Sequence, residues 1–262
     1  MKKIKKILIM GLPGSGKSFL ARSLAKDLKA VWLNADNIRK KFMDWDFSYE
    51  GRKRQALRMS ELASYYIKKK RIVVADFICP LNITRKIFKP DLLIWMDTIK
   101  KGRFSNTNKI FSPPKKYDLR IKEKNLELNK LKIKDKLNKY KWNNRLPTAQ
   151  MLGRYQPWHE GHKKLFEEIL KKVNQINIQI KDVYQIGDNP FSYKKIKKII
   201  NLDLKDYKNR YKISLAPNIT NIFYGRTVGY KINKINLDKK TQKISATRIR
   251  TELRKKGKLK PI

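Results

Sequence analysis

The N-terminal part of the chain alternates between short apolar runs and longer segments with apolar residues at helical spacing. Compact apolar runs predict buried strands, whereas apolar residues three and four positions apart predict amphipathic helices. Helices are expected at residues 19–29 and 52–70. The strands are expected at residues 3–10, 31–33, 72–75 and 92–96. Strands that alternate with helices favour right-handed crossovers and a parallel sheet, so this part of the chain is predicted to be an α/β domain.

The periodicity then stops and restarts further along the chain. Residues 100–116 have no period and hold glycine and proline, which is typical of a loop or lid. Residues 121–146 are rich in Lys, Asn, Leu and Glu and predict a basic helical linker. The later elements are expected at residues 148–152 (strand), 163–173 (helix), 183–186 and 220–224 (strands), and from Thr247 onward (helix). We therefore divide the chain into a first α/β domain at 1–120, the linker, and a second α/β domain at 147–262.

Composition adds a strong positive charge and points to the cytoplasm. The formal net charge of the 262 residues is +43. Such a charge suits nucleic acid or other anions, but the lysines are spread along the whole chain, which favours a compositional bias over a dedicated binding surface. The basic start resembles a secretory signal, yet its apolar run ends in a glycine loop, and no run is long enough to span a membrane. Cys79 is the single cysteine, so an intrachain disulfide is excluded.

A phosphate-binding motif follows the first predicted strand. The segment 11–18, Gly-Leu-Pro-Gly-Ser-Gly-Lys-Ser, matches G-x-x-x-x-G-K-[ST] in full, with a strand before it and a helix after it. In such a loop the backbone N–H groups surround the phosphates, Lys17 reaches the β- and γ-phosphates, and the Ser18 hydroxyl binds Mg²⁺. The predicted ATP phosphate-binding residues are Gly11, Gly14, Ser15, Gly16, Lys17 and Ser18.

Three further segments resemble adenylyl-sulfate kinase. They are Asn-Ala-Asp-Asn-Ile-Arg at 34–39, Asp-Phe-Ser-Tyr-Glu-Gly-Arg at 46–52 and Ala-Asp-Phe-Ile-Cys-Pro at 75–80, and the resemblance covers about residues 4–118. It implies transfer of the γ-phosphate of ATP to the 3′-hydroxyl of adenylyl sulfate, with Asp36 orienting or deprotonating that hydroxyl and helping to place Mg²⁺. Arg39 and Arg52 would hold acceptor phosphate or sulfate, because a guanidinium matches such oxyanions. Phe77 would stack on a base.

The chain also departs from this family pattern, which reads D-G-D-N-x-R, then G-F-S-x-x-x-R-x-x-N. Asn34 replaces the first aspartate, Asp46 replaces the glycine before the phenylalanine, and Gln55 replaces the final asparagine. Asp76 occupies a position that is small or polar in the family. The basic lid is shorter. These loops determine which acceptor binds, so a related small nucleotide or phosphorylated metabolite fits the same frame.

Structural alternatives remain for each of these acceptor-site residues. Asp36 could cap the helix that follows it, since aspartate is a favoured N-cap residue. The two arginines could be surface charges. Phe77 could belong to the core, and Asp76 could serve only to end a strand.

Both histidines of the chain lie in one short segment, Gly-Arg-Tyr-Gln-Pro-Trp-His-Glu-Gly-His at 153–162. His159 and His162 are three residues apart at a strand–loop–helix junction, which places both rings near one face of the first helical turn. Zinc is a poor alternative, because the segment has no partner cysteine.

This segment resembles the HxGH signature of the nucleotidylyltransferase superfamily, which includes nicotinamide-mononucleotide adenylyltransferases and small cytidylyltransferases. The segment Ile-Ser-Ala-Thr-Arg-Ile-Arg at 244–250 is similar to its I-S-x-T-x-I-R motif, and residues 189–192 and 225–227 resemble intermediate motifs. The resemblance implies a Rossmann-like domain in which a substrate anion attacks the α-phosphorus of ATP or CTP and pyrophosphate leaves. The residues it implies are Gly153, Arg154, His159, His162, Ser245, Thr247 and Arg250. The alternative for Ser245 and Thr247 is helix capping, and for Arg250 an ordinary surface charge.

Together the motifs predict a bifunctional transferase, with a P-loop kinase domain followed by a Rossmann-like HxGH nucleotidylyltransferase domain. Lys17, Asp36, His159 and His162 are its predicted catalytic residues, with Mg²⁺ as cofactor and ATP, and at the second site ATP or CTP, as substrate. Small anionic metabolites are the expected partners, and binding to a membrane is not expected. One alternative is sulfate activation, with an ATP sulfurylase beside the kinase. Another is a basic nucleic-acid-binding protein or polynucleotide kinase, which the charge alone does not exclude. Whether the chain forms a homodimer stays open.

Overall fold

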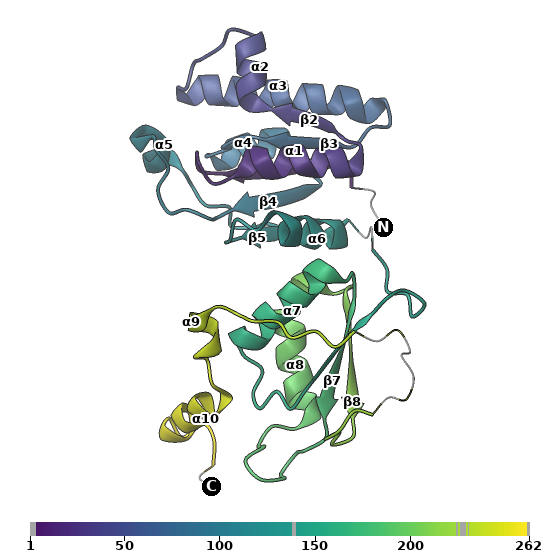
Figure 1. Ribbon diagram of the computed structural model, residues 1–262. Coiled ribbons are helices and arrows are strands. Elements are labelled where there is room, and N and C mark those ends of the chain that lie inside the picture. Colours follow the sequence, from purple (N-terminus) through teal and green to yellow (C-terminus); the bar gives the residue numbers. More distant parts are fainter. Residues whose placement is uncertain (1–3, 138–139, 224, 226–228, 230, 261–262) are drawn as a thin grey trace. The chain divides into compact units, whose positions relative to one another are not determined.

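The computed structural model describes residues 4–137, 140–223, 225, 229 and 231–260. The chain forms two compact units, Met1–Leu137 and Asn138–Ile262 (Figure 1). Each unit contains its own parallel sheet. Within the described residues, no helix has both the length and the apolar character needed to cross a membrane.

The N-terminal unit is built on a five-stranded sheet with the order β2-β3-β1-β4-β5, and every neighbouring pair is parallel. Its strands are β1 Lys6–Gly11, β2 Val31–Asn34, β3 Val73–Asp76, β4 Leu92–Met96 and β5 Leu119–Ile121. Its helices are α1 Lys17–Leu28, α2 Ala35–Lys41, α3 Tyr49–Lys68, α4 Asn82–Phe88, α5 Ser105–Ile110 and α6 Leu126–Lys136. The parallel α/β sheet expected from the sequence is confirmed.

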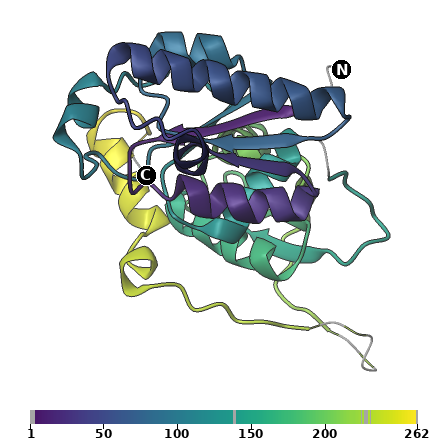
Figure 2. The same cartoon turned by 90° about the horizontal axis from the view of Figure 1, so that it is seen from above.

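Strand β1 shows why this sheet is covered on both faces. Successive side chains of a strand point to opposite faces, and β1 is apolar at every central position. Ile7 and Ile9 pack with α1 and with Ile133 of α6, whereas Leu8 and Met10 pack with the apolar face of α3. Figure 2 shows α1 and α3 on opposite sides of the strands.

The segment expected as a linker belongs partly to this unit, which corrects the predicted boundaries of 1–120 and 121–146. Strand β5 extends the sheet through parallel pairing with β4, and α6 packs on α1. Leu128 and Ile133 of α6 are buried, although the helix as a whole is rich in lysine. A few well-placed apolar side chains are therefore enough to anchor a helix whose composition resembles a solvated connector. The predicted lid also contains a short helix, α5.

The C-terminal unit has a three-stranded parallel sheet with the order β6-β7-β8 among its described residues. Its strands are β6 Ala149–Gly153, β7 Ile176–Lys181 and β8 Tyr211–Ala216. Its helices are α7 Glu160–Lys172, α8 Tyr193–Asp203, the 3₁₀ turn Lys205–Tyr207, α9 Lys239–Gln242 and α10 Ala246–Lys255. Helices α7 and α8 are the crossovers between these strands. That the unit as a whole is a Rossmann-like domain stays a prediction.

Two strands expected in this unit were placed wrongly. Residues 183–186 form a turn after β7, with Gln185 in the left-handed region at φ 62° and Ile186 exposed. Residues 220–223 have no regular structure, and Tyr224 lies outside the described residues. The true strand β7 reads Ile-Asn-Ile-Gln-Ile-Lys, with every isoleucine buried and polar residues between them. Its alternation is the pattern of a half-exposed strand, which a search for compact apolar runs passes over.

Candidate functional site

The phosphate-binding loop runs from β1 to α1 and depends on its glycines. Gly14 and Gly16 have φ values of 88° and 90°, a region that L side chains rarely adopt. Gly11 has no room for a side chain, because a Cβ there would meet the carbonyl oxygen of Met96 at 2.4 Å. Helix α1 begins at Lys17 with no side chain capping its first turn. Its first N–H groups are therefore free to bind an anion, and the helix dipole favours negative charge at that end.

Lys17 lies buried beside this loop. Its Nζ donates a hydrogen bond of 2.8 Å to the carbonyl oxygen of Leu12, which holds the ammonium group near the loop. Burial lowers the pKa of Lys17 to about 8, while the carboxylates of Asp76 and Asp36 act in the opposite direction. Lys17 is therefore held close to the loop, the place from which the lysine of this motif reaches the β- and γ-phosphates.

A hydrogen-bond network joins the end of β3 to the first turn of α1. The Ser18 hydroxyl donates to Oδ2 of Asp76 at 2.5 Å, and Nδ2 of Asn34 donates to the same oxygen at 3.0 Å. The indole Nε1 of Trp32 donates to Oδ1 at 2.6 Å. Burial raises the pKa of Asp76, and these three donors oppose that effect. The Asp76 carboxyl group thus receives hydrogen bonds on both oxygens.

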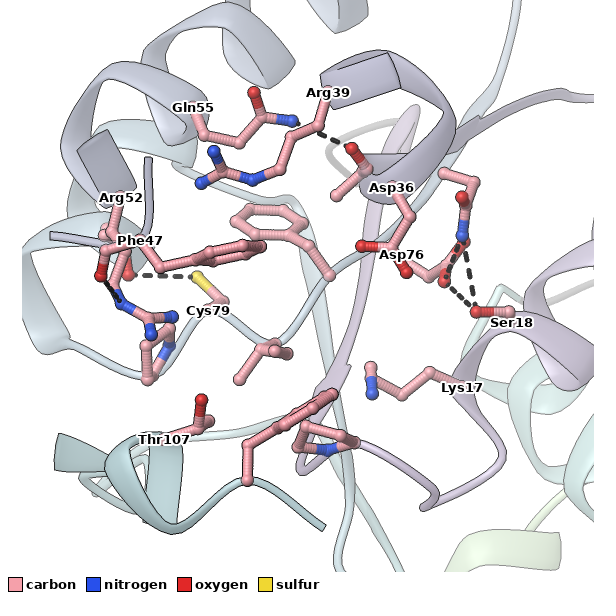
Figure 3. Close-up of a pocket in the computed structure, with 18 of the residues that line it drawn as sticks. Lys17, Ser18, Asp36, Arg39, Phe47, Arg52, Gln55, Asp76, Cys79 and Thr107 are labelled. Atoms are coloured by element: carbon pink, nitrogen blue, oxygen red, sulfur yellow. Dashed lines mark hydrogen bonds between the residues drawn. The ribbon is translucent and has the colours of Figure 1, made fainter. Parts of the chain in front are cut away.

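A cavity of about 670 Å³ opens next to this network (Figure 3). Its volume lies in the range of small-molecule sites, roughly 300–1,000 Å³. Lys17 and Ser18 line one end, and side chains from α2, α3, the end of β3 and the predicted lid line the rest. The sequence-predicted residues found in it are Gly14, Lys17, Ser18, Asp36, Arg39, Arg52 and Phe77. The predicted phosphate-binding and acceptor-binding residues therefore share one pocket.

Both predicted acceptor arginines are buried, so neither is an ordinary surface charge. Nη1 of Arg39 donates to the carbonyl oxygens of Asp44 and Asp46, each at 2.9 Å, which ties down the chain between α2 and α3. Nε of Arg52 donates to the carbonyl oxygen of Phe47 at 2.8 Å, and its guanidinium lines the cavity. Arg39 therefore works largely as a positioning residue, whereas Arg52 presents charge to the pocket.

Asp36 does not cap the helix that contains it. The N-cap of α2 is Asn34, whose side chain accepts a hydrogen bond from the backbone N–H of Asn37 at 3.0 Å. Asp36 is exposed on the first turn and lines the cavity near Lys17. The capping alternative for Asp36 is therefore removed, and its carboxyl group is accessible to a ligand.

Phe77 belongs to the core and also borders the cavity, while its stacking on a base stays a prediction. Its ring packs edge-to-face on Phe88 with 5.3 Å between the ring centroids, and it belongs to the core on the α3 side of the sheet. It also lines the cavity, where Trp45, Phe47 and Phe104 add further aromatic surface. Trp45, Phe47 and Phe104 are each about half exposed. The sequence motifs identified Phe77 and left these three unassigned, because only the folded loops bring them together.

The predicted lid borders the cavity through Arg103, Phe104, Asn106 and Thr107. Gly102 contacts the phosphate-binding loop, since an added Cβ would lie 3.0 Å from Pro13. The backbone N–H and carbonyl of Gly102 both bond to the side chain of Asn108, at 2.9 and 2.8 Å. The start of the predicted lid is therefore fastened to its own short helix, α5.

The two histidines of the C-terminal unit stack on each other at the start of α7. Their ring centroids are 3.8 Å apart. Nδ1 of His159 accepts a hydrogen bond from the N–H of Gly161, and Nδ1 of His162 accepts one from the N–H of His159. A nitrogen that accepts a hydrogen bond carries no proton, so each neutral imidazole carries its proton on Nε2. The capping box of α7 thus fixes both rings as Nε2–H donors.

Burial keeps these rings neutral. Desolvation lowers the pKa of His162 to about 3, with a smaller effect from His159, and it also lowers the pKa of His159. The ring of His162 lies against Tyr155 and Trp158, with centroids 5.0 and 5.3 Å away. The indole of Trp158 is held by a 2.8 Å bond to Oδ2 of Asp203. Aromatic packing therefore excludes water from one side of the histidine pair.

The other predicted residues of the second site differ in their availability. Arg250 is buried, with Nε bonded to Asp188, Nη1 to the carbonyl of Gln156 and Nη2 to Thr247, so it links α10 to the histidine segment. Ser245 is the N-cap residue of α10, yet its side chain makes no capping bond. Arg154 is exposed. Gly153 lies against the Tyr155 ring, where a Cβ would be 2.8 Å away. Of the intermediate motifs, Arg226 and Thr227 lie outside the described residues.

Within the part of the chain that the structure describes, no group of three or more His, Cys, Asp and Glu side chains gathers to hold a metal ion. Mg²⁺ does not require such a group, because it keeps several waters and binds one or two carboxylates together with substrate phosphates. The hydroxyl of Ser18 and the carboxyl oxygens beside it are the hard donors that Mg²⁺ prefers. The residues at the phosphate-binding loop therefore fit this ion.

The glycine loop, the buried lysine and the adjoining cavity define the N-terminal unit as a P-loop nucleotide-binding unit. Residues 3–93 match the family described as Adenylylsulphate kinase. The resemblance indicated by the motifs is confirmed for these residues. The family match ends before the C-terminal unit and does not bear on it.

Similar curated proteins are also named adenylyl-sulfate kinases. The adenylyl-sulfate kinase of Bacillus pumilus is 34% identical over 89 residues, which are 32% of this chain and 45% of that protein. The probable adenylyl-sulfate kinase of Bacillus subtilis is 36% identical over 84 residues, which are 30% of this chain and 43% of that protein. The chain thus spans less than half the length of these relatives.

Solved structures of small-molecule kinases are also similar to part of the chain. The APS kinase of Mycobacterium tuberculosis in complex with AMPPNP and APS is 23% identical with a TM-score of 0.46, covering 52% of this chain and 99% of that chain. The shikimate kinase of Aquifex aeolicus is 17% identical with a TM-score of 0.38, covering 51% of this chain and 96% of that chain.

The capping geometry predicts the protonation of both histidines. Long-range ¹H–¹⁵N NMR should show Nε2–H tautomers, and His162 should stay neutral from pH 8 down to about pH 5, well above its pKa of about 3. Unfolding returns the pKa of His162 to its ordinary value of 6.5, so below that pH the unfolded chain binds a proton that the folded chain does not. The contribution of His162 to the free energy of unfolding is therefore fully present above pH 6.5 and is lost as the pH drops toward 3. The two histidines are the only ones in the chain, and His159→Gln assigns their signals. A proton on Nδ1, or titration of His162 near pH 6.5, would contradict this geometry.

Proposed function

We propose that the N-terminal unit transfers the γ-phosphate of ATP to a hydroxyl group of a small, nucleotide-like anion, with adenylyl sulfate as the first candidate. The observation that carries the proposal is the shared cavity. It places Lys17 and Ser18 of the phosphate-binding loop with Asp36, Arg52 and Phe77, which come from three other segments of the chain. Phosphoryl transfer depends mainly on positioning and on stabilising charge, and this cavity offers groups for both.

On the donor side, the phosphates of ATP would lie along the N–H groups of the loop and the start of α1. Lys17 would place its ammonium group on the β- and γ-phosphates, where it offsets the charge that develops during transfer. Ser18 would hold Mg²⁺, which when bound neutralises the phosphate oxygens. Burial of Lys17 strengthens its attraction to the phosphates, because charges interact more strongly away from water.

On the acceptor side, Asp36 would orient the attacking hydroxyl or take its proton, since its carboxyl group is exposed in the cavity and does not cap α2. Arg52 would bind an acceptor oxyanion. Arg39 would support it indirectly, by holding the loop that carries Phe47. The aromatic side chains Phe47 and Phe77 offer flat surfaces for a base.

The curated relatives named adenylyl-sulfate kinase favour adenylyl sulfate as acceptor. This acceptor carries both features that the cavity suits, a base for the aromatic surfaces and an oxyanion for Arg52. Asn34 at the end of β2, Asp46 between α2 and α3, and Gln55 on α3 nevertheless differ from the family pattern. A related small nucleotide therefore belongs in the same assay.

We further propose that the C-terminal unit transfers a nucleotidyl group from ATP or CTP and releases pyrophosphate. The fixed Nε2–H groups of His159 and His162 support this proposal, because neutral N–H donors on two stacked rings can bind phosphate oxygens as charge develops. The uncapped start of α10 at Ser245 offers free N–H groups for the β- and γ-phosphates. Arg250 would fix the position of α10 relative to the histidines through Gln156.

Asp36→Asn should leave ATP binding unchanged and lower the rate of γ-phosphate transfer by about a hundredfold or more, the usual contribution of a general base. The measurement is transfer from [γ-³²P]ATP to adenylyl sulfate and to a panel of small nucleotides, with ATP binding followed by calorimetry. The matched control is Glu61→Gln, an exposed acid on α3 outside the cavity. Equal rates in Asp36→Asn and wild type would contradict the proposed role of Asp36.

His162→Ala should reduce pyrophosphate release by roughly 10²- to 10³-fold, as expected when one oxyanion donor is lost. The assay offers ATP, CTP, GTP and UTP with phosphorylated metabolites and with sulfate, so a sulfate-activating enzyme would reveal itself by release with ATP and sulfate. Glu168→Gln on the same helix is the control, because its carboxylate pairs with Lys171, away from the two histidines. Release that is unaffected by His162→Ala, or no release with any pair, would overturn the nucleotidyl-transfer proposal.

A further inference from the structure

The acidic group closest to the Ser18 hydroxyl is Asp76, a residue that the family pattern does not assign. Asp76 ends β3, next to the strand that enters the phosphate-binding loop, with Ile9 as its partner on β1. Its side chain is almost fully buried, at 2% exposure. A buried carboxyl group is costly unless it is paired or binds a cation. The burial of the Asp76 carboxyl group is therefore not explained by its place at the end of a strand alone.

The direction of the hydrogen bonds indicates what the carboxyl group does. A serine hydroxyl has one proton and two lone pairs. The proton of Ser18 is committed to Oδ2 of Asp76 at 2.5 Å, and one lone pair accepts from Nδ2 of Asn34 at 3.3 Å. The second lone pair remains for a cation. Asp76 thus orients the hydroxyl so that it can act as a metal ligand.

The same carboxyl group is itself held in a fixed orientation. Trp32 binds Oδ1 and Asn34 binds Oδ2, and both residues belong to β2, the strand that pairs with β3. Outer partners of this kind fix the geometry of a metal site and tune its affinity. Asn34 stands where the family pattern has an aspartate. An acid is missing at the end of β2, and one is present on the neighbouring strand, within hydrogen-bond distance of Ser18.

We propose that Asp76 is the Mg²⁺-positioning carboxylate of this site, acting through Ser18, and that Asp36 is left to serve the acceptor alone. The proposal rests on the proposed kinase function of the N-terminal unit. A hydroxyl from the phosphate-binding loop and an aspartate from an adjacent strand are a recognised pair for holding Mg²⁺ with a nucleotide. Asp76 is buried and bonded to Ser18, whereas Asp36 is exposed on α2 and bordered by the open cavity. Figure 3 shows both carboxyl groups on the side of the cavity where Lys17 and Ser18 lie.

The test measures how far Mg²⁺ tightens binding of the non-hydrolysable analogue AMPPNP, by calorimetry in EDTA and in Mg²⁺. Asp76→Asn should leave the affinity in EDTA unchanged and reduce the tightening by Mg²⁺ by about 10- to 100-fold, the usual effect of losing an outer-shell partner. Asp36→Asn is the matched control and should keep the tightening. Retained tightening in Asp76→Asn, or an equal loss in Asp36→Asn, overturns the assignment. A wild-type chain that binds no AMPPNP in either condition overturns the kinase function itself.

A second measurement is made on the wild-type chain, and a variant serves only to assign one signal. With Mn²⁺ in place of Mg²⁺ and AMPPNP bound, the paramagnetic ion should broaden the indole N–H signal of Trp32, because that indole donates to Asp76 at 2.6 Å. Trp32→Phe assigns the signal among the five tryptophans. A Trp32 signal that is broadened no more than the other indole signals contradicts a metal site at Asp76.

Discussion

The parallel pairing of β1, β3 and β2 in one register is the constraint on which the first site depends. Asp76 is paired with Ile9 on one side and with Asn34 on the other, so three strands end at the same edge of the sheet. Ligands of open α/β sheets bind at this edge because the loops and helix N-termini gather there. A shift of β3 by one residue would turn Asp76 to the opposite face and break its contact with Ser18.

The same edge explains the electrostatics of the cavity. Lys17, Arg39 and Arg52 are all buried, and burial lowers the pKa of each of them. Cations held away from water attract phosphate and sulfate more strongly than surface cations do. The cavity therefore carries a specific attraction for anions, distinct from the diffuse charge of +43 on the chain. Lysines spread along the chain contribute to nonspecific attraction at most, because exposed charges are screened by salt.

The sequence predicted the N-terminal sheet and the phosphate-binding loop well, because both have strong local signals. Strand β1 is a continuous apolar run, and the glycines of the loop occupy positions that the backbone requires. The signal was weak for α6, whose anchoring depends on Leu128 and Ile133 within a lysine-rich segment. It was also weak for β7, where polar residues alternate with buried isoleucines. Elements with few apolar residues are recognised only when their packing partners are known.

The motifs predicted which residues belong to the candidate sites, but they did not predict how those side chains are arranged. The motifs brought attention to Asp36, Arg39 and the two histidines, but they could not show that Asn34 caps α2 or that Arg39 is occupied by backbone carbonyls. Nor could they reveal the bond between Ser18 and Asp76, because it joins residues 58 positions apart. Such contacts depend on the order of the strands in the sheet, which cannot be read from the motifs of a single sequence. Whether a motif residue can bind a ligand therefore depends on which of its hydrogen-bond donors and acceptors are not already used within the fold.

We propose that one cavity of the N-terminal unit holds the triphosphate and its acceptor together. Phosphorus-31 NMR of ATP with the wild-type chain, Mg²⁺ and adenylyl sulfate tests this most directly, since it follows both the γ-phosphate and its destination. The γ-phosphate signal should decline only when the acceptor is present, and a phosphomonoester signal should appear on the acceptor. Decay of ATP to inorganic phosphate at the same rate with and without acceptor would contradict this proposal.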